Sequence, residues 1–181
     1  MPTGMNRAIQ VRTADRLRAS LATDALSGLP SIVALSELDQ RELCEVGGGR
    51  LAAVAIQVAW RLGALVEEPQ VLHFEALMVR EVARLIDDHV RRTDLLGVLG
   101  SDTLLVLAPG LDPLGGRSLA DRLRSFLADR VIDLGGVQVE LRVKVGAAFR
   151  SAASPPGWTT GALAAEADMH SSEALAVEHV A

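Results

Sequence analysis

Aromatic residues, cysteine and lysine are scarce in this sequence. Phe and Trp together make up 3% of the 181 residues, and Tyr is absent. The core must therefore be aliphatic, and the aromatic platforms on which single-stranded nucleic acid stacks are few. Cys44 is the single cysteine, which excludes an internal disulfide and a cysteine-based zinc site.

Positive charge is also in the minority. The chain has 18 Lys and Arg residues against 23 Asp and Glu residues, which gives a net charge of −5. A chain with this balance has no general positive field for a nucleic-acid backbone. No direct nucleic-acid partner is therefore expected.

Long apolar stretches are missing as well. No run approaches the roughly 20 apolar residues that a membrane-spanning helix needs. Met1–Arg18 mixes apolar and basic residues and lacks the apolar core of a signal peptide. The sequence thus predicts a cytoplasmic protein with no membrane partner.

What is present is an ordinary globular composition, with 49% hydrophobic and 23% charged residues. Apolar spacing predicts helices over Met5–Ala22, Ser31–Val46, Gln70–Val90, Ser118–Ala128 and Thr159–Val180, and strands over Leu51–Ala59, Leu95–Leu99, Thr103–Ala108 and Val137–Val145. Hairpins mixed with crossover helices indicate the α/β class, as an α+β sandwich with one sheet flanked by helices.

Three connecting segments complete this outline. Gly100–Asp102 is expected to be a hairpin turn, and Pro109–Gly116 is expected to be a loop. Residues 1–22 form an amphipathic helix with no core of its own, so we expect it to serve dimerisation or partner binding. Residues 23–178 then form the domain.

Several motifs within this domain occur in a familiar order. They are Asp24-Ala-Leu-Ser-Gly-Leu-Pro30, the hairpin Leu99-Gly-Ser-Asp-Thr-Leu104, Pro109, Val143-Lys-Val-Gly-Ala147 and Ala167-Asp168. Together they resemble the GGDEF, or diguanylate cyclase, family. This resemblance implies a nucleotidyl-cyclase-like fold, with a central mixed, mainly antiparallel sheet flanked by helices.

The resemblance is incomplete at the positions that carry catalysis in the family. In the signature Gly100, Ser101, Asp102, Thr103, Leu104, only the first glycine and the acid agree with the family pattern. Ala59 stands where the family has a Mg²⁺-binding aspartate, and Mg²⁺ prefers carboxylate oxygens. The positions that contact guanine and phosphate in the family are occupied here by Glu67, Ala76 and Leu175. The resemblance therefore predicts a degenerate, catalytically inactive domain with no Mg²⁺ or other cofactor.

A ligand-binding motif of the family is retained. Arg91-Arg-Thr-Asp94 matches its inhibitory R-x-x-D motif, with five residues between Asp94 and the signature, and Arg122 matches a further arginine of that site. The same bare pattern occurs at Arg84/Asp87, so its position before the hairpin carries the information. The resemblance implies a site for cyclic di-GMP, which acts there as an intercalated pair.

The chemistry of these side chains suits that ligand. An arginine fork matches the O6 and N7 acceptors of guanine, and a carboxylate such as Asp94 accepts from its N1–H and amino group. Arginines also pair with phosphates. The sequence thus predicts a cyclic di-GMP receptor that passes its signal to an unknown protein effector and forms a homodimer.

Three alternatives stay open at this point. Arg91 and Asp94 are also compatible with a surface ion pair at a helix end. The domain is also compatible with a nucleotide-independent interaction module that acts through residues 1–22. Asp102 is also compatible with a residual cyclase or a GTP-binding protein, although aspartate is a common residue in hairpin turns without any such function.

Overall fold

The computed structural model describes residues 7–25, 27–37, 46–62, 68–151, 163–164, 166–168 and 170. Its elements are α1 (Arg7–Ser20), α2 (Ile32–Glu37), β1 (Arg50–Leu62), α4 (Glu68–Asp87), β2 (Leu95–Val98), β3 (Thr103–Pro109), α5 (Pro113–Leu127), β4 (Val131–Leu134) and β5 (Val137–Ser151). The strands form a five-stranded sheet in the order β2-β3-β1-β5-β4, with antiparallel neighbours. The predicted sheet flanked by helices is therefore confirmed.

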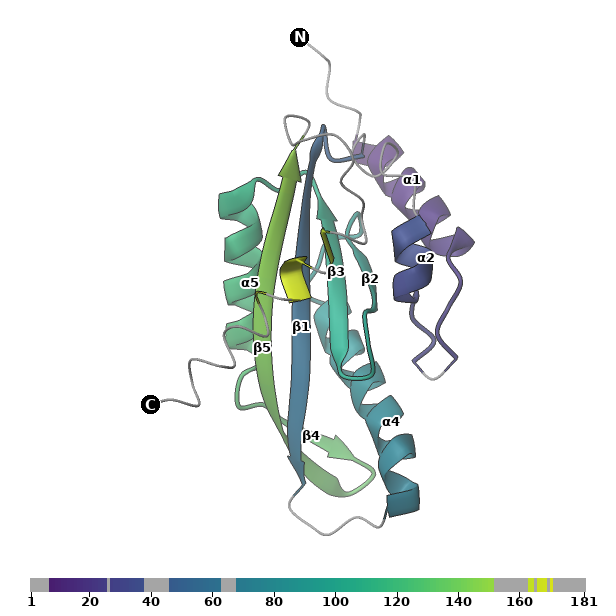
Figure 1. Ribbon diagram of the computed structural model, residues 1–181, viewed down its shortest axis with the longest axis vertical. Coiled ribbons are helices and arrows are strands. Elements are labelled where there is room, and N and C mark those ends of the chain that lie inside the picture. Colours follow the sequence, from purple (N-terminus) through teal and green to yellow (C-terminus); the bar gives the residue numbers. More distant parts are fainter. Residues whose placement is uncertain are drawn as a thin grey trace.

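Strand β1 lies at the centre of the sheet, and both of its faces are covered (Figure 1). Every residue of the apolar run from 51 to 56 is fully buried. Ala52, Val54 and Ile56 pack in a cluster with α4 and α5, while alternate residues pack with α2 and with Leu163, Ala164 and Ala167. A strand buried on both faces needs a continuous apolar run, and this run predicts the strand correctly.

Helix α5 starts earlier than the sequence indicated, so the prediction of a loop through Gly116 is wrong. Asp112 caps the helix because its Oδ1 accepts a hydrogen bond from Gly115 N at 2.7 Å, and Pro113 occupies the first turn. A β-carbon at Gly116 would overlap the Phe149 ring on β5. The glycine that looked like a loop residue thus lies where α5 packs closely on the sheet.

The last hairpin also differs from the expectation. The apolar alternation predicted one strand from Val137, whereas the structure has β4 before it and extends β5 to Ser151. Gly135 and Gly136 form the turn with φ of +66° and +92°. In β4 only Ile132 is buried, so its apolar pattern was too short to predict a strand.

The predicted N-terminal helix is confirmed over α1, which contacts the domain. Ala14 is 1% exposed, and Gln10 Nε2 donates to Val46 O at 3.0 Å. The predicted second helix is confirmed over α2, and residues 38–45 lie outside the described part. Of the predicted C-terminal helix, the described residues between 163 and 170 are helical and the rest lies outside.

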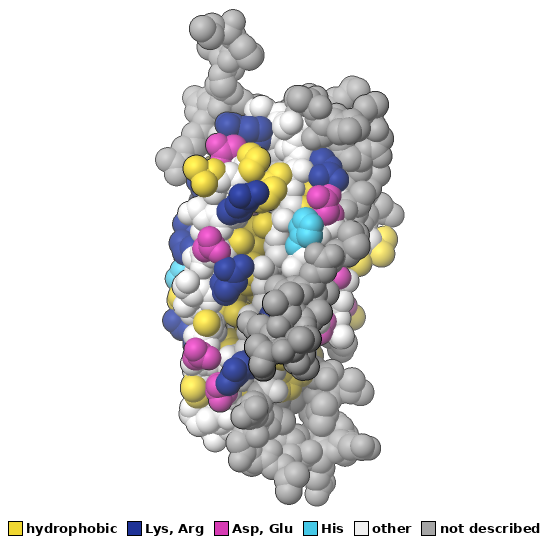
Figure 2. Space-filling view, turned by 60° about the vertical axis from the view of Figure 1, so that its left-hand side comes forward, with side chains coloured by type: hydrophobic (Ala, Val, Ile, Leu, Met, Phe, Trp, Pro, Cys, Tyr) yellow, Lys and Arg dark blue, Asp and Glu magenta, His cyan; other side chains and the backbone are white. Residues whose placement is uncertain are grey.

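The face formed by α5 and β5 carries arginines and acids interspersed with apolar side chains (Figure 2). Arg124 pairs with Asp121 at 2.6 Å, and Arg142 pairs with Glu140 at 3.1 Å. Each of these pairs places opposite charges side by side on this face. Among the described helices, none combines the length and hydropathy needed to cross a membrane.

Candidate functional site

The predicted signature hairpin is present. Leu99 N donates to Thr103 O at 2.9 Å, and Gly100 N donates to the same oxygen at 3.3 Å, so the turn spans the predicted positions. Ser101 is exposed at its tip. A β-carbon added at Gly100 would meet nothing within 4 Å, so the tip is not crowded.

The carboxylate of Asp102 is engaged within the protein. Its Oδ2 accepts from Gln57 Nε2 at 3.2 Å, and its Oδ1 accepts from Thr103 Oγ1 at 2.9 Å. Its carbonyl accepts from Val58 N at 2.8 Å. The bonds from Gln57 and Val58 fasten the hairpin to β1, and the bond from Thr103 lies within the hairpin, so the acid of the signature has a structural role.

The residues at this point do not fit Mg²⁺. Ala59 follows Val58 on β1, close to Asp102, and its methyl group offers no oxygen ligand. Mg²⁺ requires near-octahedral oxygen coordination, usually with one or two carboxylates. Within the described residues there is no group of three His, Cys, Asp or Glu side chains that could hold a metal ion. Asp102 is thus the one carboxylate that the hairpin and the adjoining part of β1 offer, and it is already bonded to the protein.

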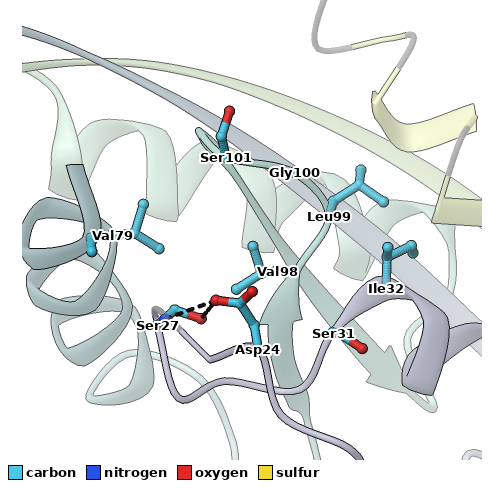
Figure 3. Close-up of a pocket in the computed structure, with 10 residues that line it drawn as sticks. Asp24, Ser27, Ser31, Ile32, Val79, Val98, Leu99, Gly100 and Ser101 are labelled. Carbon is cyan, nitrogen blue, oxygen red and sulfur yellow. Dashed lines mark hydrogen bonds between the residues drawn. The ribbon is translucent and has the colours of Figure 1, made fainter. Parts of the chain in front are cut away.

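A pocket of about 370 Å³ lies beside the hairpin (Figure 3). We call it the hairpin pocket; its lining residues are Asp24, Ser27, Ser31, Ile32, Ala76, Val79, Val98, Leu99, Gly100 and Ser101. Ala76, which stands at a guanine-contacting position of the resembled family, lines it with a methyl group. Glu67 and Leu175 lie outside the described residues. The pocket is therefore mainly apolar where it is described.

The Asp24–Pro30 motif forms the wall of this pocket as a closed loop. Asp24 Oδ1 accepts from both the backbone N and the Oγ of Ser27 at 2.8 Å (Figure 3). Gly28 takes a φ of +72°, which glycine adopts without strain. Val98 N donates to Pro30 O at 2.8 Å, so the loop is fixed to the edge strand β2.

The R-x-x-D segment forms the turn between α4 and β2. Asp94 is 2% exposed, and its Oδ2 accepts from Arg91 N at 2.8 Å. Asp94 N donates in return to Arg91 O at 2.9 Å. Asp94 therefore binds the backbone of Arg91, while the Arg91 side chain is exposed. The carboxylate organises the turn, and the alternative of a surface ion pair between these two side chains does not describe it.

Arg122 lies next to this turn. Its Nη2 donates to His89 O at 2.9 Å, which joins α5 to the segment that leads into Arg91. The His89 ring stacks on Phe126 with 3.5 Å between ring centroids, and the Arg130 guanidinium lies 4.1 Å from the Phe126 centroid on α5. The structure thus places Arg122 beside the segment that leads into the Arg91 turn.

Sequence reasoning missed the stacked group formed by His89, Phe126 and Arg130. Arg122 and Phe126 are four residues apart on α5, so their spacing was a usable signal for one part of this group, whereas Arg130 lies beyond the end of the helix. The partner His89 comes from another helix end, and nothing in the spacing identifies it.

A second missed contact involves Arg92, inside the R-x-x-D segment. Its Nη2 lies 3.2 Å from Asp15 Oδ2 on α1, although the two residues are 77 positions apart. The side chains are 76% and 44% exposed. The turn therefore carries contacts to two helices, α5 through Arg122 and α1 through Arg92.

Comparison with known proteins identifies the fold. No family model and no curated protein matches the sequence. Among solved structures, the chain is similar to a sensory box/GGDEF family protein from Caulobacter crescentus, with 24% identity, a TM-score of 0.66, and coverage of 86% of this chain and 98% of that one.

Two further structures are informative because of their bound molecules. The GGDEF domain of DgcB from Caulobacter crescentus, in complex with c-di-GMP, has 17% identity, a TM-score of 0.63, and coverage of 86% of this chain and 88% of that one. Diguanylate cyclase SiaD in complex with its activator SiaC, from Pseudomonas aeruginosa, has 19% identity, a TM-score of 0.66, and coverage of 94% and 64%. The chain therefore has the GGDEF-domain fold, as the sequence motifs predicted.

Proposed function

We propose that this chain is a cyclic di-GMP receptor without cyclase activity. The observation that carries the proposal is the hydrogen bond from Arg122 to His89 O, because it holds the two predicted arginine-bearing segments together. Arg91, Arg92 and Arg122 are all exposed around the same turn. Three guanidinium groups at one turn suit a ligand that carries two phosphates.

Asp94 has a different role in this proposal from that of a guanine contact. Because it is buried and bonded to Arg91 N, it fixes the backbone from which the Arg91 side chain projects. Direct contact between its carboxylate and a base would require the turn to open. Ligand recognition in the closed turn is therefore assigned to the arginines.

The absence of catalysis is proposed from the state of Asp102 and Ala59. The Asp102 carboxylate accepts hydrogen bonds from Gln57 and Thr103, and the neighbouring Ala59 supplies no oxygen. Transfer of a nucleotidyl group in this family chemistry requires a divalent cation at that point. We expect no Mg²⁺-dependent turnover of GTP, even at high protein concentration.

Similar structures support both halves of the receptor proposal. One GGDEF domain of this fold is in complex with c-di-GMP, and one cyclase is in complex with an activator protein. By analogy, the ligand would favour one state of a homodimer or of a complex with a protein effector, through its greater affinity for that state.

Calorimetric titration with cyclic di-GMP tests the proposal. Wild-type protein is expected to bind in the low-micromolar range or tighter, and GTP to give no comparable heat. Arg91→Ala should weaken binding about 100-fold, because it removes a charge-assisted contact to phosphate. Arg117→Ala removes an exposed guanidinium elsewhere on α5 and should bind as the wild type does. Equal affinity in wild type and Arg91→Ala would refute the assigned site.

A second function is favoured by the contact between Arg92 and Asp15. It is a nucleotide-independent interaction module in which α1 docks on the domain or on a partner. The exposed pair contributes at most about 1 kcal/mol to docking of α1. Asp15→Arg is expected to increase amide exchange in α1 up to about fivefold, and the swapped variant Asp15→Arg/Arg92→Asp should restore protection. Unchanged amide exchange in Asp15→Arg would show that the contact with Arg92 does not hold α1 on the domain.

A further inference from the structure

A second cavity is lined by residues of the Asp24–Pro30 loop and shares Ser27 with the hairpin pocket. It has a volume of about 420 Å³ and lies between this loop, α4 and β2. Its lining residues are Thr23, Ser27, Gly28, Leu29, Pro30, Arg80, Ala83, Arg84, Asp87 and Leu96. We call it the α4 cavity. Its volume falls within the range of roughly 300–1,000 Å³ typical of small-molecule sites.

Two arginines on successive turns of α4 give this cavity positive charge. Arg80 is exposed, and within the described part of the chain its guanidinium makes no hydrogen bond or ion pair. Arg84 Nε lies 3.1 Å from Glu81 Oε2, and this contact orients the guanidinium without using its two terminal nitrogens. The arrangement leaves donors from both arginines available on one side of the cavity.

The remaining walls combine apolar surface with a few polar groups. Leu29, Pro30, Ala83 and Leu96 supply the apolar part, and Thr23 adds a hydroxyl. Asp87 stands one turn beyond Arg84 and would repel an anion placed next to it. A ligand must therefore put its negative charge at the Arg80 end and a neutral or donor group near Asp87.

We propose that the α4 cavity binds a phosphate monoester attached to an apolar or planar body. Phosphate matches the arginine donors in a bidentate manner, and its terminal oxygens form charge-assisted hydrogen bonds. The apolar walls stabilise the body by removing its surface from water. Neither Arg91 nor Arg122 lines the cavity, so this site is independent of the proposed cyclic di-GMP site.

Titration with phenyl phosphate, followed by amide NMR of the full chain, tests the site. Saturable shifts are expected at Thr23, Gly28, Ala83 and Asp87, and inorganic phosphate should bind more weakly because it lacks the ring. Arg80→Glu/Arg84→Glu should weaken binding at least about tenfold, because two charge-assisted contacts are replaced by repulsion. Arg142→Glu, on the distant strand β5, is a control with the same type of charge change at an exposed residue.

The outcomes separate the possibilities. Retained binding in Arg142→Glu and in Arg91→Ala, with loss in the double variant, supports the site whether or not cyclic di-GMP binds elsewhere. Shifts that fail to saturate, or that decrease equally in the double variant and in Arg142→Glu, would mean non-specific attraction to arginine and would overturn the proposal. Phenol serves as the uncharged probe, and binding equal to that of phenyl phosphate would also overturn it.

Discussion

Gly97→Ala is expected to lower the free energy of unfolding by about 3 kcal/mol, at the upper end of the usual cost of overpacking. A β-carbon at this position on β2 would lie 2.6 Å from Pro30 O and would also overlap the Leu35 side chain. Leu35 is fully buried, so it has little space to move into. Pro30 O accepts the hydrogen bond of Val98 N, so moving it would detach the Asp24–Pro30 loop from the sheet.

Gly100→Ala is the matched control for this prediction. Gly100 lies in the same hairpin, yet a β-carbon there meets nothing within 4 Å. Its effect should stay within about 0.5 kcal/mol, as for other surface substitutions. Urea unfolding of the two variants measures the difference. Equal stability of Gly97→Ala and Gly100→Ala would contradict the close contact between Gly97 and Pro30 O. It would also contradict the position of the loop that lines the two cavities.

The second large effect is expected at Asp94. Asp94→Ala should lower stability by about 1–3 kcal/mol, because it leaves Arg91 N without its acceptor inside the turn. It should also weaken cyclic di-GMP binding at least about tenfold, since the Arg91 backbone is no longer held. Thermal unfolding and calorimetry on one preparation give both quantities.

Asp94→Asn separates the structural role from a role in contacting guanine. The amide oxygen of asparagine still accepts from Arg91 N, so the turn and its stability should persist. If Asp94 acts by organising the turn, this variant binds the ligand nearly as well as the wild type. A loss of binding as large as that in Asp94→Ala, at undiminished stability, would instead show that the charge of the buried carboxylate is needed.

The fold could be predicted from the sequence where local pattern and tertiary environment agree. The run from Leu51 to Ile56 predicts a strand buried on both faces, and the apolar stripe of α4 predicts its packing. The prediction failed at Gly116 because a glycine is needed there to make room for the Phe149 ring, and Phe149 lies far along the chain. Strand β4 was not predicted because its single buried residue, Ile132, gives no periodic pattern.

In the candidate site, too, some features could be predicted from local sequence and others depend on residues far apart in the chain. The family resemblance associated Arg122 with the R-x-x-D segment, and in the structure the Arg122 guanidinium donates to His89 O, two residues before Arg91. The burial of Asp94 could not be predicted, because an aspartate in a turn is usually exposed. The link from Arg92 to Asp15 joins segments with no common motif, and only their packing brings them together.

The central position of β1 has a consequence for how this chain is made. Leu51 pairs with Pro109 on one side and with Arg150 on the other. During synthesis, β1 leaves the ribosome long before β5, its most extensively paired neighbour. The apolar run from Leu51 to Ile56 within β1, with its strand edges open, is a template for association with other chains. The high contact order of this pairing also slows folding. We therefore expect the nascent chain to depend on chaperones until Ser151 has emerged.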